Sequence, residues 1–242
     1  MKSVGIICEY NPFHNGHLYH LQKVKEMFPN TPIVLILSGN FTQRGIPSLL
    51  DKWDKTEIAL HYGVDLVIEL PFSFATQSAD IFAYGAIRLL SLLQVDYLVF
   101  GSESNNIDQL TKLVPVVSSP KYHELVRSYQ SQGNNYPTSL NLALKELSGT
   151  SLNTPNDLLG FSYIKEIAHQ QANIIPFTIQ RTNDFHGKEL NQEISSATSI
   201  RKAIKDKVDI SSCVPNITLN YLKKTNYDIC LLYTSPSPRD TR

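Results

Sequence analysis

The chain has 242 residues, which is enough for one large α/β domain or two small ones with a substantial buried core. Its 22 Lys and Arg balance its 22 Asp and Glu, and this zero net charge argues against bulk electrostatic binding of nucleic acid or membranes, so any polyanion must meet a local patch. Cys8, Cys213 and Cys230 form no CxxC pair, and no apolar stretch approaches the roughly 20 residues of a membrane helix, so we expect a soluble cytoplasmic protein with reduced thiols and no membrane partner.

Short runs rich in β-branched residues alternate with segments of helical spacing. We expect them to form buried strands, over Ser3 to Cys8, Pro32 to Leu37, Val64 to Leu70, Val95 to Phe100 and Ile174 to Ile179. A helix is expected over Asp51 to Tyr62, where Gly63 ends it, and another is expected after Ser78. This alternation predicts an α/β fold with a doubly wound parallel sheet.

The second half of the chain begins with a different pattern. Residues 107–147 hold three helical patterns separated by Pro115, Pro120 and Pro137, which predicts a helical insertion before the last strand. Asn156 is a good N-cap for a helix that continues through His169. Residues 231–242 have no apolar residue after Tyr233 and contain two Ser-Pro steps, so we expect a non-native, disordered tail there.

The strongest chemical signal is an HxGH motif, His14-Asn15-Gly16-His17, which follows the first strand and opens the first helix. A helix N-terminus offers free backbone N–H groups and a positive dipole end to phosphate oxygens. Two imidazoles at positions i and i+3 share one face of the first turn and can donate to the same phosphate. Two unrelated surface histidines are the alternative, and a metal site is weaker because no third ligand is evident.

This motif and four further segments resemble the bacterial tRNA(Met) cytidine acetate ligase family of the HxGH nucleotidylyltransferase superfamily. The segments are Gly5 to Leu18, Ser38 to Gly45, Asp51 to Trp53, Gly63 to Phe72 and Phe100 to Glu103. The resemblance implies a Rossmann-like ATP-binding domain over residues 1–230, without a helical region that members carry after it. It also implies that ATP and acetate form acetyl-AMP, and that the acetyl group passes to the wobble cytidine of elongator tRNA(Met). Mg²⁺ would bridge the triphosphate, held mainly by phosphate and water.

The resemblance also implies a set of site residues. The catalytic candidates are His14, His17 and Arg44. The candidate nucleotide contacts are Ile7, Glu9, Tyr10, Asn11, Pro12, Phe13, Asn15, Gly16, Gly101, Asn156, Arg181, Ser196 and Arg201. Several have plainer alternatives: an ordinary solvent loop around Arg44, a turn glycine at Gly101 after the fourth strand, a surface cation at Arg181 and a simple N-cap at Ser196.

Two neighbouring residues are interpreted separately. Lys52 is a weak site candidate, whereas Trp53 is expected in the core, where most tryptophans lie. No nucleophile triad or carboxylate pair has supporting context, so catalysis by positioning and charge stabilisation is expected. Two other functions stay open, adenylation of a phosphorylated cofactor precursor and a non-catalytic nucleotide- or RNA-binding module. A basic tRNA platform is a further option, built from Arg181, Lys188, Arg201, Lys202, Lys205 and Lys207.

Overall fold

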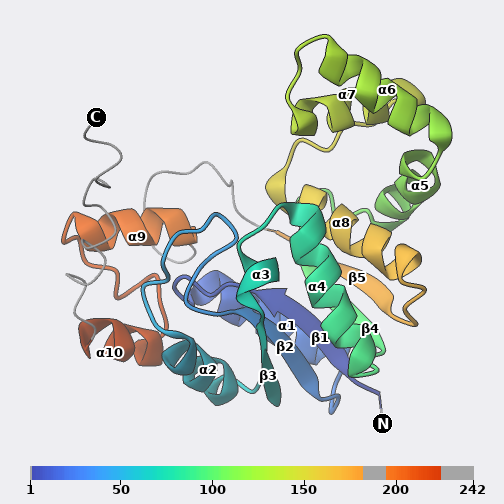
Figure 1. Ribbon diagram of the computed structural model, residues 1–242. Coiled ribbons are helices and arrows are strands. Elements are labelled where there is room, and N and C mark those ends of the chain that lie inside the picture. The colour runs from blue at the N-terminus through green and yellow to red at the C-terminus, as the bar shows by residue number, and fades with distance from the viewer. Residues whose placement is uncertain (1, 182–194, 225–242) are drawn as a thin grey trace. The chain divides into compact units, whose positions relative to one another are not determined.

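The computed structural model describes residues 2–181 and 195–224 (Figure 1). The predicted tail, Cys230 and Lys188 lie outside these residues. The chain divides into two compact units. The first unit combines residues 1–78 with residues 183–242, and the second comprises residues 79–182.

The first unit contains three parallel strands, β1 (Val4–Cys8), β2 (Ile33–Ser38) and β3 (Leu66–Leu70). Its described helices are α1 (Asn15–Met27), α2 (Lys52–His61), α3 (Phe72–Ala75), α9 (Ala197–Lys205) and α10 (Asn216–Lys224). All six residues of β2 are buried, as expected for a strand with neighbours on both sides. By contrast, β3 exposes Leu66 and Glu69, so the expectation that this run is a fully buried strand is wrong.

The second unit begins with α4 (Ala79–Leu92) and carries two parallel strands, β4 (Tyr97–Ser102) and β5 (Ile175–Gln180). Between them lie α5 (Ile107–Val117), α6 (Pro120–Ser131), α7 (Tyr136–Ser148) and α8 (Pro155–His169). Helices α5 to α7 occupy the segment where the sequence predicts an insertion. Pro120 and Pro137 stand in the first turns of their helices, but Pro115 lies inside α5 near its end and separates nothing.

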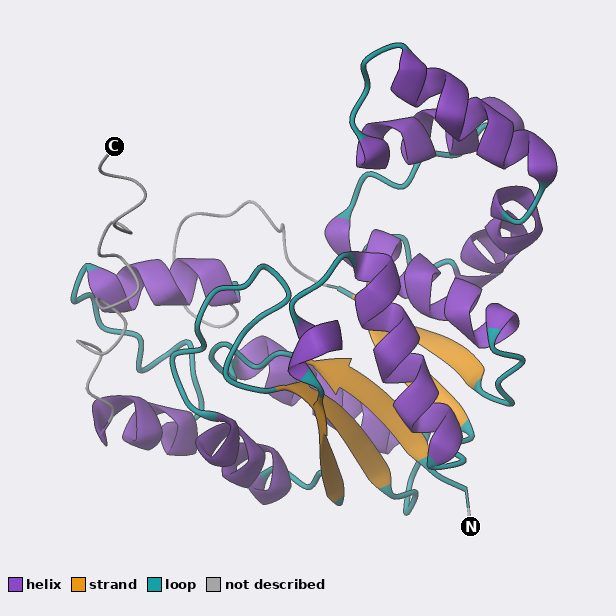
Figure 2. Cartoon of the chain, in the orientation of Figure 1, coloured by secondary structure: helices purple, strands orange, loops and turns teal. Residues whose placement is uncertain are grey.

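The strands have the order β3-β2-β1-β4-β5. The described pairings are parallel, and helices accompany the strands in both units (Figure 2). The predicted doubly wound parallel fold is therefore confirmed. In a parallel sheet the carboxyl ends of the strands meet at one edge, where ligands bind. None of the helices in the described part of the chain is both long enough and apolar enough to cross a membrane.

Candidate active site

The HxGH motif begins α1 through reciprocal hydrogen bonds. His14 is the N-cap, and its Nδ1 accepts a hydrogen bond from Gly16 N at 3.0 Å. His17, in the third position of the helix, accepts one from His14 N at Nδ1, over 3.3 Å. The two rings stack with their centroids 3.8 Å apart. Because each Nδ1 is an acceptor, a neutral imidazole carries its proton on Nε2, the atom that can donate to an anion.

The backbone N–H groups at the start of α1 already have partners. Asn15 N donates to Cys213 O at 3.1 Å, Gly16 N donates to His14, and His17 N and Leu18 N both donate to His14 O. Asn15 is held further by its side-chain Nδ2, which donates to Ser212 O at 2.8 Å. The expectation that the N–H groups of this turn are free is therefore wrong. In this motif the imidazole Nε2 atoms are the groups that can donate to a ligand.

The start of α9 differs from that of α1. Ser196 is the N-cap and accepts a hydrogen bond from Ser199 N at 3.1 Å, as the plain cap interpretation predicts. Among the described residues, Ala197 N and Thr198 N have no hydrogen-bond partner. This nine-residue helix therefore presents unpaired N–H groups at its positive end.

Arg201 brings α9 to the segment that precedes the HxGH motif. Its Nη1 donates to Asn11 O at 2.7 Å. Burial lowers the pKa of Arg201, the nearby Glu9 carboxylate opposes this effect, and Arg44 adds to it. Asn11 is itself buried, and its Oδ1 accepts from Leu49 N at 2.8 Å while its Nδ2 has no acceptor among the described residues. A buried donor without a partner is costly unless a ligand or water satisfies it.

The loop after β2 forms a tight turn that carries Arg44. Thr42 N donates to Ile46 O and Gly45 N donates to Thr42 O, both at 2.9 Å, and Gly45 has a φ of 71°, which suits glycine. Gln43 N anchors the loop by donating to Glu9 Oε1 at 2.6 Å. Arg44 is exposed and has no hydrogen bond or ion pair among the described residues. The first unit thus brings together the HxGH motif, this loop and Arg201.

Two other predicted site residues, Tyr10 and Phe13, are almost fully buried. Their rings pack on His17, with centroid distances of 4.8 Å for Tyr10 and 5.7 Å for Phe13. Burial raises the pKa of Tyr10 well above its ordinary value, so this side chain stays neutral. Both residues therefore hold the His17 imidazole in place. Pro12 between them is also buried, and Ile7 near the end of β1 is half-buried.

Sequence reasoning missed Lys55, a lysine with no exposed surface. Its Nζ donates to Ser38 O at 2.7 Å, Gly39 O at 2.6 Å and Glu9 O at 3.0 Å, and it lies 3.2 Å from Ser48 Oγ. Burial lowers its pKa to about 8, against the opposing effect of nearby carboxylates. Lys55 ties the ends of β1 and β2 to the Arg44 loop. Its position on the same helical face as Ile58 and Ala59 was the signal available in the sequence.

The adjacent residues Lys52 and Trp53 also depart from expectation. Trp53 is 68% exposed, so its assignment to the core is wrong. The buried face of α2 contains Lys55, and a residue two positions earlier points to another side of the helix. Lys52 makes an ion pair of 2.7 Å with Glu69.

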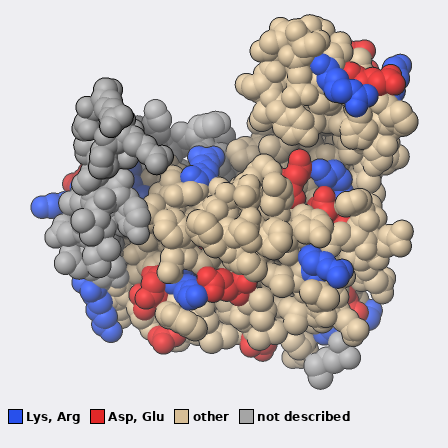
Figure 3. Space-filling model, viewed as in Figure 1, with Lys and Arg blue, Asp and Glu red and all other residues tan. Residues whose placement is uncertain are grey.

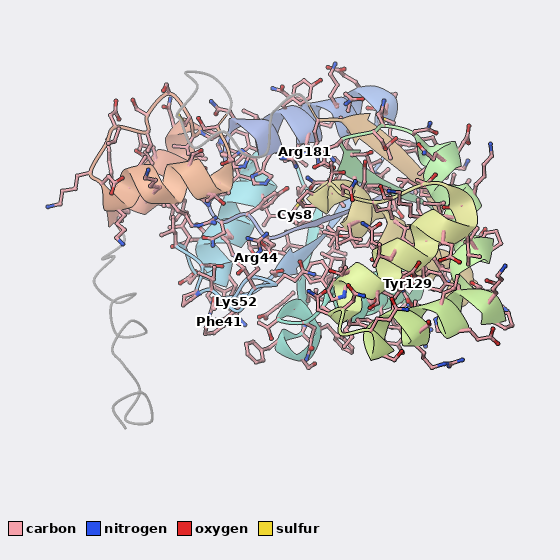
Figure 4. The ribbon with its side chains drawn as sticks, turned by 90° about the horizontal axis from the view of Figure 1, so that it is seen from above. Cys8, Phe41, Arg44, Lys52, Tyr129 and Arg181 are labelled. Atoms are coloured by element: carbon pink, nitrogen blue, oxygen red, sulfur yellow. The ribbon has the colours of Figure 1, made fainter. Side chains whose placement is uncertain are left out.

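The second unit groups three predicted site residues around Glu103. Asn156 lies inside α8, whose N-cap is Thr154, so its expected capping role is wrong. Its Nδ2 donates to Glu103 Oε1 at 2.5 Å, and its Oδ1 accepts from Arg181 Nη1 at 3.3 Å. Gly101 lies within β4 and does not follow it as expected; a Cβ there would stand 3.2 Å from Arg181 Cγ. Gly101, Asn156 and Arg181 therefore lie together, and Figure 4 labels Arg181.

A metal site is not evident in the described residues. Across residues 2–181 and 195–224, no three His, Cys, Asp or Glu side chains are grouped so that they could hold a metal ion. On the face drawn in Figure 3, basic and acidic side chains are interspersed over a largely uncharged surface. The basic residues Lys202, Lys205 and Lys207, proposed as part of a tRNA platform, lie on or directly after α9.

Comparison with known proteins gives consistent matches. The family model described as HIGH Nucleotidyl Transferase matches residues 1–235. A tRNA(Met) cytidine acetate ligase from Mesomycoplasma hyopneumoniae (strain J) is 43% identical over 215 residues, covering 88% of this chain and 68% of that protein. The crystal structure of Thermotoga maritima TmcAL in its apo form has a TM-score of 0.87 at 36% identity, covering 93% of this chain and 56% of that one. The form bound with alpha-thio ATP has a TM-score of 0.84. Other ligases of the same name are 56–59% covered by this chain, which thus spans little more than half of most of these relatives.

Proposed function

Because the chain belongs to the tRNA(Met) cytidine acetate ligase family of HIGH nucleotidyl transferases, we propose that it activates acetate with ATP and acetylates the wobble cytidine of elongator tRNA(Met). The observation that carries this proposal is the pair of imidazoles whose Nδ1 atoms are fixed as acceptors at the start of α1. That arrangement supplies two Nε2–H donors without a nucleophile. Such donors suit a reaction in which the substrates supply both the nucleophile and the leaving group.

The first half of the proposed reaction is an in-line displacement. A carboxylate oxygen of acetate attacks the α-phosphorus of ATP, and the bond to the bridging oxygen breaks, releasing pyrophosphate. Negative charge on the phosphoryl oxygens is stabilised by the Nε2–H groups of His14 and His17, and by the guanidinium groups of Arg44 and Arg201. The unpaired N–H groups at the start of α9, beside the Ser196 cap, are further donors to phosphate.

The second half transfers the acetyl group. The exocyclic amine of cytidine attacks the acetyl carbonyl carbon, loses a proton and displaces AMP. The described residues contain no group of three His, Cys, Asp or Glu side chains that could hold a metal ion. Mg²⁺ would therefore be bound mainly by the triphosphate and not by the protein. The ion would be held by phosphate oxygens and water, neutralising charge on the leaving pyrophosphate.

The remaining candidates are assigned by what their surroundings allow. Tyr10 and Phe13 act by holding His17, so any contact that they make with the nucleotide is through the backbone. Glu9, Asn11 and Pro12 shape the turn between β1 and α1, and Asn15 and Gly16 shape the first turn of the helix. Within the first unit, Ile7 is assigned as a nucleotide contact. Within the second unit, the group of Gly101, Asn156 and Arg181 is assigned to nucleotide binding. These assignments rest on the family resemblance together with the local packing described above.

The test separates helix capping from chemistry. Gln is the usual partner of a capping box, so H17Q preserves the bond to His14 N but removes the imidazole. Formation of acetyl-AMP from ATP, Mg²⁺ and acetate is followed by mass spectrometry. We expect H17Q to unfold at the wild-type temperature and to lose about 100- to 1,000-fold in rate, the cost of one preorganised donor to transition-state charge. H17A should lose activity and some stability.

Each competing function has its own outcome. A wild-type chain that releases pyrophosphate with a phosphorylated cofactor precursor, and not with acetate, would identify the other adenylation reaction. A chain that binds ATP without releasing pyrophosphate would be a binding module. An H17Q variant with full activity would remove His17 from the catalytic group.

A further inference from the structure

Two pairs of side chains in the first unit carry exposed aromatic rings that have no role in the reaction described above. Trp53 on α2 is 68% exposed and Phe72 on α3 is 63% exposed. Phe72 meets Phe41 edge to face, with the ring centroids 5.5 Å apart. Lys52 Nζ lies 5.3 Å from the centroid of the Trp53 ring. We call Phe41, Lys52, Trp53 and Phe72 the aromatic surface.

The aromatic surface is joined to the Arg44 loop. Lys52 N donates to Asn40 Oδ1 at 3.0 Å, and Phe41 belongs to the same loop, where it pairs with Pro47. Figure 4 shows Phe41, Arg44 and Lys52 on the same side of the first unit. Through Gln43 N and Glu9 the loop also reaches the turn before the HxGH motif. A molecule on the aromatic surface would therefore lie next to the candidate phosphate-binding residues of this unit.

Packing of α2 does not explain the position of Trp53. The buried side of α2 is formed by Lys55, Ile58 and Ala59, and Trp53 lies off that side. A tryptophan that is two-thirds exposed gains little from the hydrophobic effect where it stands. Exposed aromatic residues beside a cation are typical of surfaces that bind unpaired nucleobases, since every base has a face that can stack.

The charges around the aromatic surface indicate which part of a nucleic acid it contacts. Asp54 and Glu57 flank Trp53 on α2, and Glu69 neutralises Lys52. These carboxylates repel phosphates, so a phosphate backbone would not lie over Trp53. Bases carry no such charge and can stack there, while Arg44 at the tip of the loop stays available to a phosphate.

We propose that the aromatic surface stacks unpaired bases of the RNA substrate beside the cytidine that is acetylated. This inference rests on the proposed function, because it identifies the ligand as the single-stranded loop of a tRNA. Stacking would also contribute to RNA binding, which the zero net charge of the chain does not favour. Its contribution should depend weakly on salt, unlike phosphate contacts.

Trp53 is the single tryptophan of the chain, so its own fluorescence reports on the surface. The probe is a synthetic RNA hairpin with the anticodon loop of elongator tRNA(Met), and the reference is a fully paired RNA duplex of the same length. We expect the hairpin to quench the fluorescence of the wild-type chain and the duplex to leave it unchanged.

Variants locate the effect by anisotropy of a labelled hairpin. We expect W53A and F72A each to weaken binding about tenfold, the loss typical of one stacked base. W53F keeps an aromatic face and should bind within about threefold of wild type. L92A in the second unit is the control, because Leu92 is also 63% exposed but lies outside the aromatic surface.

The outcomes distinguish this inference from the proposed function. Acetyl-AMP formation by the wild-type chain without RNA tests only the latter. Hairpin binding with no fluorescence change, equal binding by W53A and wild type, or no hairpin binding at all would overturn the stacking role. Quenching by a chain that makes no acetyl-AMP would support the surface while contradicting the proposed reaction.

Discussion

Lys55 offers the sharpest physical test of the structure, because an ammonium group is buried without a carboxylate in direct contact. Its hydrogen bonds go to backbone carbonyls at the ends of β1 and β2, and Ser48 Oγ lies nearby. Replacing it by methionine in K55M keeps the approximate length of the side chain and removes the charge. The expected signature is a pH-dependent difference in the free energy of unfolding between wild type and K55M.

The magnitude follows from the pKa of Lys55, which falls from 10.5 to about 8 in the folded chain, mainly through burial. Between these values the unfolded chain holds a proton that the folded chain has released. The unfolding free energy contributed by Lys55 therefore rises with pH, by about 1.4 kcal/mol per pH unit. Over the whole interval the rise is about 3 kcal/mol.

Urea denaturation of wild type and K55M from pH 7 to pH 10 measures this difference, and the other titrating groups cancel. K52M is the matched control on the same helix, because the Lys52 side chain reaches solvent and remains 32% exposed. The difference in the free energy of unfolding between wild type and K55M should rise with pH. The difference between wild type and K52M should not show this rise. A difference from K55M that stays constant or falls with pH would refute the account of Lys55 as a buried ammonium.

Substitutions at three further residues test local packing, hydrogen bonding and capping. G160A should lower the free energy of unfolding by about 1–3 kcal/mol in urea, because a Cβ at Gly160 would meet the Phe100 ring at 2.2 Å; wild-type stability would show that the ring moves aside. D157A should cost about 2–3 kcal/mol, because buried Asp157 accepts hydrogen bonds from Ser102 Oγ and two backbone N–H groups, and a loss below 1 kcal/mol would contradict that network. H14A should lower the melting temperature by removing an N-cap worth about 1 kcal/mol, whereas H14N should restore it because Asn is a favoured cap.

The fold could be predicted because its strands carry a strong local signal. Parallel strands with neighbours on both sides are continuous apolar runs, and the residues of β2 are buried throughout. The sequence was less informative at β3, where a run that is apolar apart from Asp65 and Glu69 leaves Leu66 exposed. Whether a strand lies at the edge of a sheet depends on which segments pair with it, and that information is not local.

The candidate site divides in the same way between local and distant contacts. The start of α1 at the HxGH motif could be predicted because the signal lies within four residues, but the hydrogen bonds between His14 and His17 that pair its N–H groups were not foreseen. Asn156 was assigned to a cap because Asn is a common N-cap residue. Nothing in the sequence indicated its actual partner, Glu103, which lies 53 residues earlier. Lys55 was missed because its carbonyl partners lie 16 to 46 residues away. Trp53 was wrongly predicted to lie in the core. Tryptophan is often buried, but this frequency does not indicate which side of a helix a particular tryptophan occupies.

The capping geometry explains why histidines suit the start of α1 better than the residues that usually cap helices. Ser, Asn or Asp at position 14 would satisfy Gly16 N equally well, and Gln at position 17 would satisfy His14 N. Ser and Asp would then offer no nitrogen donor, and the amide NH2 of Asn or Gln lies beside the accepting oxygen and not where imidazole Nε2 lies. Imidazole can accept a hydrogen bond at Nδ1 and donate one at Nε2 at the same time, and the accepted bond fixes which nitrogen carries the proton. The backbone hydrogen bonds of the helix thus set the protonation pattern that phosphate binding needs, and substitutions that preserve the cap should lose the donors alone.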